Sequence, residues 1–205
     1  MQTEFNPSRT RMNLMRAFAG ECQSRQRYYQ AALIAQQQKL VGLERMFRFT
    51  AEQEERHAMV FWKLMQDSAG QTVEITAGYP ADVFNDIRQL LDASRKEEEK
   101  EHVIVYPDFA SIADEEGFTE AAQKFRAIAE IENTHSTRFA YYAQLYRDGT
   151  LFRSDDTKQR WICLNCGHIH EGSEPPQECP VCRAEQGYFI REEEAAFTSV
   201  SVIQK

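Results

Sequence analysis

The sequence predicts a mainly α fold, in which a four-helix bundle is followed by a small β-rich domain that holds a metal. Residues 8 to about 147 are rich in Ala, Glu, Gln, Arg and Leu and poor in Gly, a composition typical of long helices. After Asp148-Gly149 the composition changes to Gly, Pro, Cys and short strand-like runs that include two CxxC pairs. These observations divide the chain into a bundle, 1–148, and a small domain, 149–205.

Breaks in the helical pattern define four helices, expected at residues 8–37, 42–67, 81–115 and 119–147. The first and third breaks are short, so each joins an antiparallel pair of helices. The middle break, SAGQTVEITAGYP, is long enough to cross along the bundle or to exchange helices between subunits, and both readings stay open. Pro107 falls inside the third helix and predicts a kink or a bulge there.

The second and fourth helices share a polar interruption of their apolar stripes. Residues at the 4-3-4-3 spacing of a buried bundle face are, in the second helix, Leu43, Phe47, Thr50, Glu54, His57, Phe61 and Leu64. The corresponding residues of the fourth helix are Ala121, Phe125, Ile128, Glu132, His135, Phe139 and Tyr142. A Glu-x-x-His pair therefore stands in the middle of each stripe, at matching levels of the bundle.

The first and third helices also place carboxylates on their stripes. In the first helix the stripe is Leu14, Phe18, Glu21, Arg25, Tyr28 and Ala32, and in the third it is Ile87, Leu91, Ser94, Glu98, Glu101 and Val105. Glu21 and Glu98 lie 77 residues apart, while Glu54 and Glu132 lie 78 apart. The two hairpins therefore resemble two copies of one unit, with their polar residues at the same level.

Such a cluster of buried carboxylates needs compensating charge, because each bare one costs several kcal/mol. Two metal ions would supply that charge, and carboxylate plus imidazole ligands suit iron or manganese. A Glu on each of two helices with Glu-x-x-His on the other two is the pattern of di-metal carboxylate bundles. Tyr28 lies two turns from Glu21 on the same stripe, so we expect its phenol to hydrogen-bond a ligand.

The small domain carries its own predicted metal site. Cys163, Cys166, Cys179 and Cys182 form two CxxC pairs with 12 residues between them. Each pair can form a tight turn that directs two thiolates at one metal, and two such turns give a closed tetrahedral sulfur site. The residues leave zinc and iron open as the metal. Trp161, Tyr188 and Phe189 are expected to form the core beside it.

Charge and hydropathy exclude several classes of protein. The formal net charge of −8 argues against a nucleic-acid partner. There is no apolar run near 18 residues, so no membrane span is expected, and the N-terminus has no apolar segment of a secretory signal. Four paired cysteines read as metal ligands in a reducing compartment, and we expect a cytoplasmic protein.

Five segments together resemble the rubrerythrin family over nearly the whole chain. They are AFAGECQSRQRYY, AEQEERHA, EEEKEHVIVYPDFASIADEEGF, FRAIAEIENTHSTRF, and WICLNCGHIHEG with CPVC. The resemblance implies a ferritin-like di-iron four-helix bundle followed by a rubredoxin-like domain with one iron on four cysteines. It implies a hydrogen peroxide reductase that acts in oxidative-stress defence. The expected cofactors are these three irons, with no haem and no tightly bound flavin or NAD.

The same resemblance implies roles for individual residues. The di-iron ligands would be Glu21, Glu54, His57, Glu98, Glu101, Glu132 and His135, with Tyr28 and Tyr106 beside them. Glu54 and Glu132 would bridge the irons. Glu21 and Glu101 would serve one iron, and Glu98 and His135 the other. Upon reduction one iron would exchange Glu101 for His57. The mononuclear iron would be held by Cys163, Cys166, Cys179 and Cys182.

The partners implied are hydrogen peroxide, an external reductase or rubredoxin fed by NAD(P)H, and a second subunit in a head-to-tail homodimer or higher oligomer. Two alternatives remain: a ferroxidase that oxidises Fe(II) with O2, and a non-enzymatic zinc-ribbon interaction module. The chain also departs from the family pattern. RAEQGYF lacks the expected Pro-Lys after the last cysteine, and the tail REEEAAFTSVSVIQK is longer than typical.

Overall fold

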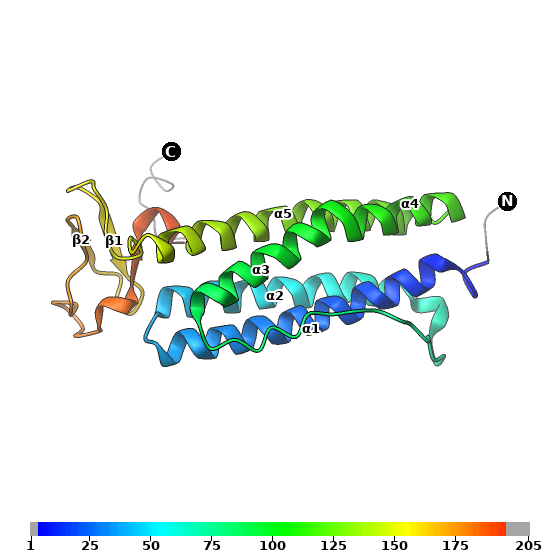
Figure 1. The fold of residues 1–205 in the computed structure, drawn as a ribbon, viewed down its shortest axis with the longest axis horizontal. Coiled ribbons are helices and arrows are strands. Elements are labelled where there is room, and N and C mark those ends of the chain that lie inside the picture. The colour runs from blue at the N-terminus through cyan, green and yellow to red at the C-terminus, as the bar shows by residue number, and fades with distance from the viewer. Residues whose placement is uncertain (1–3, 196–205) are drawn as a thin grey trace.

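The computed structural model describes residues 4–195 and has the predicted architecture (Figure 1). The long helices are α1 (Arg9–Gln37), α2 (Val41–Leu64), α3 (Ile87–Lys100), α4 (Tyr106–Glu116) and α5 (Thr119–Arg147). Helices α1 and α2 form one antiparallel hairpin, and α3 and α4 pack along α5 to form the other side of the bundle. The far end of the long C-terminal tail lies outside the described residues.

Capping groups fix where α1 begins and where α4 ends. The Ser8 hydroxyl accepts from the backbone N–H of Arg11 at 3.0 Å. The Glu116 carboxylate, at the end of α4, accepts from the N–H groups of Arg9 at 3.1 Å and Thr10 at 2.8 Å. These acceptors satisfy N–H groups that the first turn of α1 leaves free. Gly117 ends α4 with a positive φ of 83°, which costs glycine little.

The third helix of the bundle is interrupted by a single π turn, η2 (Glu101–Val105). The N–H of Tyr106 bonds to the carbonyl of Glu101, five residues back. Pro107 then lies in the first turn of α4, where its missing N–H is tolerated. The predicted bulge is thus present. The extra residue corrects the predicted stripe, because Tyr106 is buried in place of Val105, which is only half-buried.

Two other helix limits differ from the prediction. Helix α2 ends at Leu64, and a 3₁₀ turn, η1 (Gln66–Ser68), follows it. Helix α3 begins at Ile87 rather than at residue 81, because the Asp86 side chain caps it by accepting from the N–H of Gln89 at 2.9 Å.

The segment between α2 and α3 runs back along α1 in an extended path (Figure 1). The Tyr79 hydroxyl donates to the carbonyl of Arg16 at 2.8 Å, and the Arg16 side chain donates to the carbonyl of Thr76 at 3.1 Å. Farther on, Arg27 pairs with Asp82 at 2.8 Å. The chain therefore crosses along its own bundle.

Two apolar clusters occupy the two halves of the bundle. The half nearer the small domain has Tyr28, Phe47 and Phe139 at its centre, with ring centroids 5.1 to 6.4 Å apart. The other half repeats this with Phe61, Tyr106 and Phe125, at 5.2 to 6.0 Å. The predicted polar residues lie between the two clusters, so apolar rings close the site from both ends.

The small domain is a three-stranded antiparallel sheet with the strand order β2-β1-β3. The strands are β1 (Arg160–Cys163), β2 (Ile169–Glu171) and β3 (Phe189–Arg191), with the short turns η3 (Gln186–Tyr188) and η4 (Glu192–Glu194) beside β3. Trp161 and Phe189 are buried in its core, and Tyr188 packs against them. Within residues 4–195 no helix is long and apolar enough to span a membrane.

Candidate metal centres

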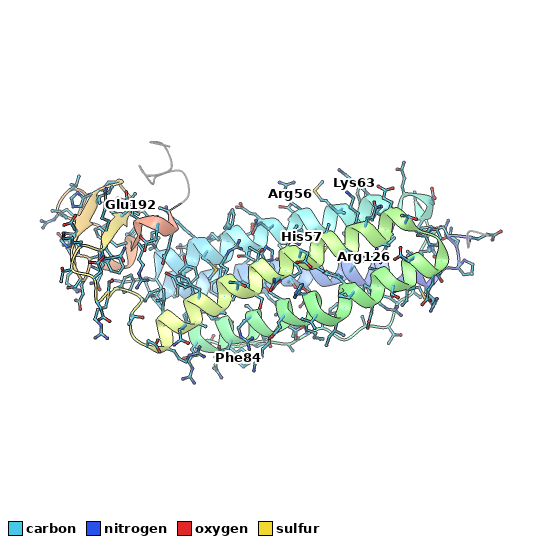
Figure 2. The ribbon with its side chains drawn as sticks, turned by 90° about the horizontal axis from the view of Figure 1, so that it is seen from above. Arg56, His57, Lys63, Phe84, Arg126 and Glu192 are labelled. Atoms are coloured by element: carbon cyan, nitrogen blue, oxygen red, sulfur yellow. The ribbon has the colours of Figure 1, made fainter. Side chains whose placement is uncertain are left out.

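Six polar side chains from helices α1, α2, α3 and α5 meet at the middle of the bundle. The residues are Glu21, Glu54, His57, Glu98, Glu132 and His135, and each is buried to 6% exposure or less. Their positions follow from the helix stripes, which turn these residues inward at one level. In Figure 2, His57 lies between the helices, whereas its neighbour Arg56 lies at the outer surface of α2.

The side chains form two four-residue groups that share two carboxylates. One group is Glu21, Glu54, His57 and Glu132, and the other is Glu54, Glu98, Glu132 and His135. Within each group the potential ligand atoms lie within 4.8 Å of one another. Glu54 and Glu132 belong to both groups, so each can bridge two metal ions. Each ion would then have three carboxylates and one imidazole, a hard donor set that suits iron or manganese.

The inward nitrogens of the two histidines and the oxygens of the two shared carboxylates lack hydrogen-bond partners among the described residues. Nδ1 of His57 lies 2.9 Å from Glu132 Oε1, and Nδ1 of His135 lies 2.8 Å from oxygens of both Glu54 and Glu132. No hydrogen bond of good geometry uses either nitrogen or the facing oxygens of the two shared carboxylates. Buried polar atoms that converge without partners are the arrangement that metal ligands need, so the residues fit a di-metal site.

Glu101 is the predicted ligand that the structure does not bring into either group. It opens the π turn and is half-buried, whereas Glu98, one turn earlier, is fully buried. His57 stands in the first group where Glu101 was expected to serve. Burial, with the charges of Glu98 and Glu132, nevertheless raises the pKa of Glu101 well above its usual value. Its carboxyl therefore lies close to the cluster but outside it.

Two tyrosines, one in each apolar cluster, contact the two carboxylates that belong to only one group, Glu21 and Glu98. The Tyr28 hydroxyl donates to Glu98 Oε1, and the Tyr106 hydroxyl donates to Glu21 Oε1. Each tyrosine thus reaches from one hairpin to the carboxylate of the other. Burial raises the pKa of both phenols well above the usual value, so both keep their protons. The predicted hydrogen bond from Tyr28 to a ligand is confirmed, and the ligand is Glu98.

Burial and mutual contacts shift the pKa values of the ligand groups in opposite directions. Burial raises the pKa of Glu21 and Glu98 well above the usual value. Burial alone would lower the pKa of His135, but its contacts with Glu132 and Glu54 dominate and raise it to about 11. Burial alone would also lower the pKa of His57. Its contacts with Glu132, Glu21 and Glu54 outweigh this effect and raise the pKa.

A hydrogen-bonded chain behind His135 was missed by the sequence reasoning. Nε2 of His135 lies 3.1 Å from Gln53 Oε1, and the same oxygen accepts from Arg138 at 3.0 Å. Both residues lie beside the apolar stripes rather than on them, so helical periodicity gave no signal for them. Arg25, by contrast, lies on the expected stripe but pairs at the surface with Glu55 at 3.8 Å.

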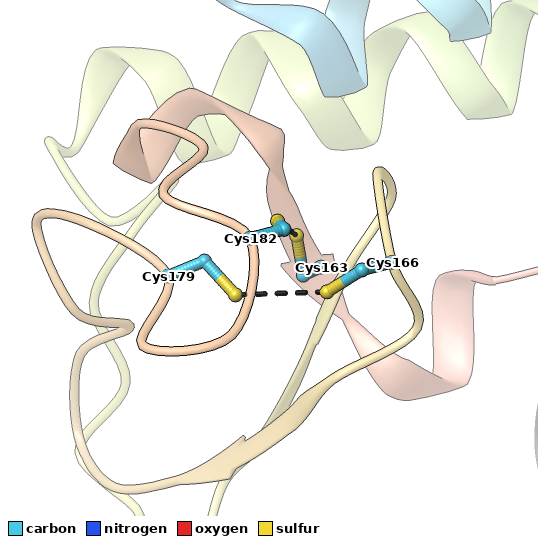
Figure 3. A group of neighbouring side chains, drawn as sticks. All are labelled: Cys163, Cys166, Cys179 and Cys182. Atoms are coloured by element: carbon cyan, nitrogen blue, oxygen red, sulfur yellow. Dashed lines mark hydrogen bonds between the residues drawn. The ribbon is translucent and has the colours of Figure 1, made fainter.

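The four cysteines converge on one point in the small domain (Figure 3). Sγ of Cys163 lies 3.7 Å from Cys182, and Sγ of Cys166 lies 3.7 Å from Cys179. These distances are too long for disulfides. Four sulfurs bound tetrahedrally at about 2.3 Å from a metal would lie about 3.8 Å apart, so the site has the right size.

The two cysteine turns share one backbone design. The N–H of Gly167 bonds to the carbonyl of Cys163 at 2.8 Å, and the N–H of Arg183 bonds to that of Cys179 at 3.0 Å. Gly167 and Arg183 both have a positive φ, of 78° and 64°. Hydrogen bonds, the first from the Asn165 side chain, lower the pKa of the Cys182 thiol to about 6, which favours the thiolate that a metal binds.

Comparison with known families matches both parts of the chain. A family model described as Rubrerythrin matches residues 12–143, and one described as Rubrerythrin, rubredoxin-like domain, matches residues 161–190. The chain is 42% identical to a rubrerythrin of Clostridium perfringens over 89% of this chain and 93% of that protein. It is 39% identical to a rubrerythrin of Nitratidesulfovibrio vulgaris over the same shares.

Solved structures show the same architecture. The chain resembles nigerythrin in a structure described as fully reduced and all ferrous, with a TM-score of 0.60 and 25% identity over 92% of each chain. A reduced symerythrin from Cyanophora paradoxa, at 21% identity and a TM-score of 0.55, shares the fold over 64% of this chain and 81% of its own. The comparisons and the donor geometry agree on a di-metal site in the bundle and a four-cysteine site in the small domain.

Proposed function

Because the chain belongs to the rubrerythrin family, we propose that it is a hydrogen peroxide reductase with two irons in the bundle and one on the four cysteines. The observation that carries the proposal is the presence of both centres in one chain: a di-metal site with two shared carboxylates, and a four-sulfur site. A ferroxidase needs only the first of these. A cytoplasmic location belongs to the proposal, since metal-binding thiolates persist in a reducing compartment.

The reaction consumes two electrons and two protons for each H2O2 and yields two waters. Bound ferrous ions would supply the two electrons, so that the O–O bond breaks without release of a hydroxyl radical. The protein's own groups exclude water and hold protons. The aromatic clusters around Tyr28 and Tyr106 close both ends of the site. Their phenols hold a proton against Glu98 and Glu21, and would be the nearest protein proton donors to these two ligands.

The four-cysteine iron would return electrons singly, after receiving them from an external reductase or rubredoxin fed by NAD(P)H. Within one chain the small domain touches α2 far from the di-metal site, where Arg45 donates to the carbonyl of Leu164 at 3.1 Å. Arg45 and Glu54 are nine residues apart (54 − 45), or about 14 Å along the helix. We therefore propose a head-to-tail homodimer in which the small domain of one subunit serves the bundle of its partner.

The relay predicts a specific effect of Cys166→Ser. The variant loses a sulfur ligand, so steady-state peroxide turnover with NAD(P)H and a reductase should fall to background. A single reaction of the chemically reduced bundle with peroxide should keep its wild-type rate. Cys22→Ser, which removes an exposed cysteine outside the metal groups, is the matched control and should retain turnover. Loss of both reactions in a folded, metal-loaded Cys166→Ser protein would refute the relay.

A further inference from the structure

The chain of side chains behind His135 has a fixed direction of hydrogen bonding. Arg138 donates through Nη1 to Gln53 Oε1 at 3.0 Å, and Gln53 Oε1 also lies 3.1 Å from Nε2 of His135. Arg138 is on α5, one turn beyond His135, and Gln53 is on α2, next to the shared ligand Glu54. The chain therefore links two helices that both carry metal ligands.

The chemistry of these groups leaves one consistent assignment of protons. A guanidinium donates hydrogen bonds and never accepts them. The Gln53 amide must therefore turn its oxygen, not its NH₂ group, towards Arg138. That same oxygen faces Nε2 of His135, so Nε2 must carry a proton. When a metal displaces the second proton and the ring is neutral, its lone pair therefore lies on Nδ1, the nitrogen that faces Glu54 and Glu132.

The guanidinium of Arg138 is itself held in place. The same Nη1 donates to the Thr50 hydroxyl at 2.9 Å, and that hydroxyl donates to the carbonyl of Met46 at 3.0 Å. The guanidinium also lies over the ring of Phe49, 5.1 Å from its centroid. A long side chain held by Thr50 and Phe49 can orient the Gln53 amide that it also touches.

The other histidine of the site has no such support. Among residues 4–195, no hydrogen bond is formed by Nε2 of His57, whose side chain is 8% exposed. The side chain of His135 is fully buried. Two histidines at equivalent positions of the two hairpins therefore differ in what holds their outer nitrogen. His135 is fixed in one tautomer and orientation, and His57 is not.

We propose that Arg138 is a positioning residue of the di-metal site. It fixes the orientation of the Gln53 amide, which in turn fixes His135 as the Nε2–H tautomer with Nδ1 presented to the metal. Arg138 acts through Gln53 and touches no ligand itself. The inference rests on the metal-binding part of the proposed function and is independent of whether peroxide is the substrate.

Cobalt(II) titration of the full-length metal-free protein tests the proposal directly. Wild type should bind two Co(II) ions in the bundle, seen as d–d absorption, and the cobalt–thiolate absorption of the four-cysteine site is an internal control. Arg138→Met removes the donors and keeps an unbranched apolar side chain, so one of the two bundle ions should bind about tenfold more weakly. Arg126→Met, at an exposed arginine of the same helix, is the matched control and should bind as wild type.

Two further variants separate positioning from a general structural role. Gln53→Glu in the Arg138→Met background supplies an acceptor that cannot flip, so it should restore affinity to about the wild-type level. Gln53→Met should weaken the same ion about tenfold, and adding Arg138→Met to it should cause no further loss. If Arg138→Met alone does not fold, the single variant Gln53→Met still tests the link from the amide to His135.

Three results would overturn the proposal. These are wild-type cobalt affinity in Arg138→Met, a loss that Gln53→Glu does not restore, or additive losses in the Arg138→Met, Gln53→Met double variant. Failure of the wild type to bind two cobalt ions in the bundle would instead refute the di-metal site itself.

Discussion

At the scale of single residues, protons and metal ions compete for the same imidazole and carboxylate atoms of the di-metal site. Contacts with Glu132 and Glu54 raise the pKa of His135 to about 11, and burial raises the pKa of Glu21 and Glu98. Without metal, His135 therefore keeps its extra proton at neutral pH, and the two carboxyls bind protons more tightly than they would in water. A metal needs the neutral imidazole and the ionised carboxylate, so binding must displace those protons.

This competition predicts a pH dependence of metal affinity. A group whose pKa is raised stays protonated below that pKa, so the metal-free form is favoured as pH falls. Apparent affinity should therefore rise with pH, by about tenfold per pH unit for each proton displaced. Zinc titrations in chelator-buffered solutions at several pH values, with proton release followed in parallel, measure both quantities. An affinity that does not change with pH, or no proton release, would contradict the assignment.

At the scale of elements, helical periodicity located most of the bundle and failed at Arg25, which pairs at the surface, and at the π turn. All predicted stripe residues of α2 from Leu43 to Phe61 are buried, and Glu132 and His135 of α5 are buried too. The third stripe holds as far as Glu98 and then slips by one residue at η2. Pro107 marked the place of the irregularity. Whether the irregularity is a kink or a π turn depends on which backbone carbonyls accept the hydrogen bonds, and apolar spacing does not encode this.

Contacts between polar residues that are distant in the chain could not be predicted from the sequence, for a different physical reason. The contact of Arg138 with Gln53 joins two polar residues that lie beside the seam, where many polar residues are merely solvated. The path of the crossover along α1 depends on contacts such as that of Tyr79 with the carbonyl of Arg16. Such pairings between distant polar groups leave no periodic trace in the sequence.

The π turn predicts the effect of removing one residue. Deletion of Val103, which is 60% exposed, should restore a regular helix and keep Tyr106 facing inward. Glu101 would then lie in rigid α-helix, and the exchange of Glu101 for His57 that the family resemblance implies would be hindered. We expect the bundle to bind metal at the Glu98 and His135 side, while peroxide turnover falls about tenfold or more.

Steady-state peroxidase assays and metal analysis check this prediction. Val103→Ala keeps the residue count and the π turn, so it is the control and should retain turnover. Wild-type turnover in the deletion variant, with circular dichroism showing an intact bundle, would show that the π turn has no role in the reaction.

At the scale of the whole molecule, the small domain is seated closely on the end of the bundle. A Cβ at Gly187 would lie 1.7 Å from the carbonyl oxygen of Lys39, in the turn between α1 and α2. Lys39 also pairs with Glu185 at 2.6 Å, and Tyr141 of α5 donates to Glu194 at 2.6 Å. The junction therefore depends on a glycine where two backbones meet.

Gly187→Ala should accordingly separate the domains without destroying either. The clash is with backbone, so the small domain must move away from Lys39. We expect faster amide exchange in residues 41–46, with both metal sites still loaded. Gly78→Ala, where no atom lies within 4 Å of the added Cβ, is the control and should exchange as wild type. Unchanged exchange in Gly187→Ala would contradict the described junction.

Anaerobic stopped-flow absorbance tests the central claim most directly. The fully reduced, iron-loaded protein is mixed with hydrogen peroxide and, separately, with O2, while the ferric–oxo and ferric–thiolate bands are followed. The account predicts rapid oxidation of the bundle by peroxide, much slower oxidation by O2, and oxidation of the four-cysteine iron after the bundle. Faster oxidation by O2 would identify a ferroxidase instead, and the absence of a thiolate band would show that the small domain holds no iron.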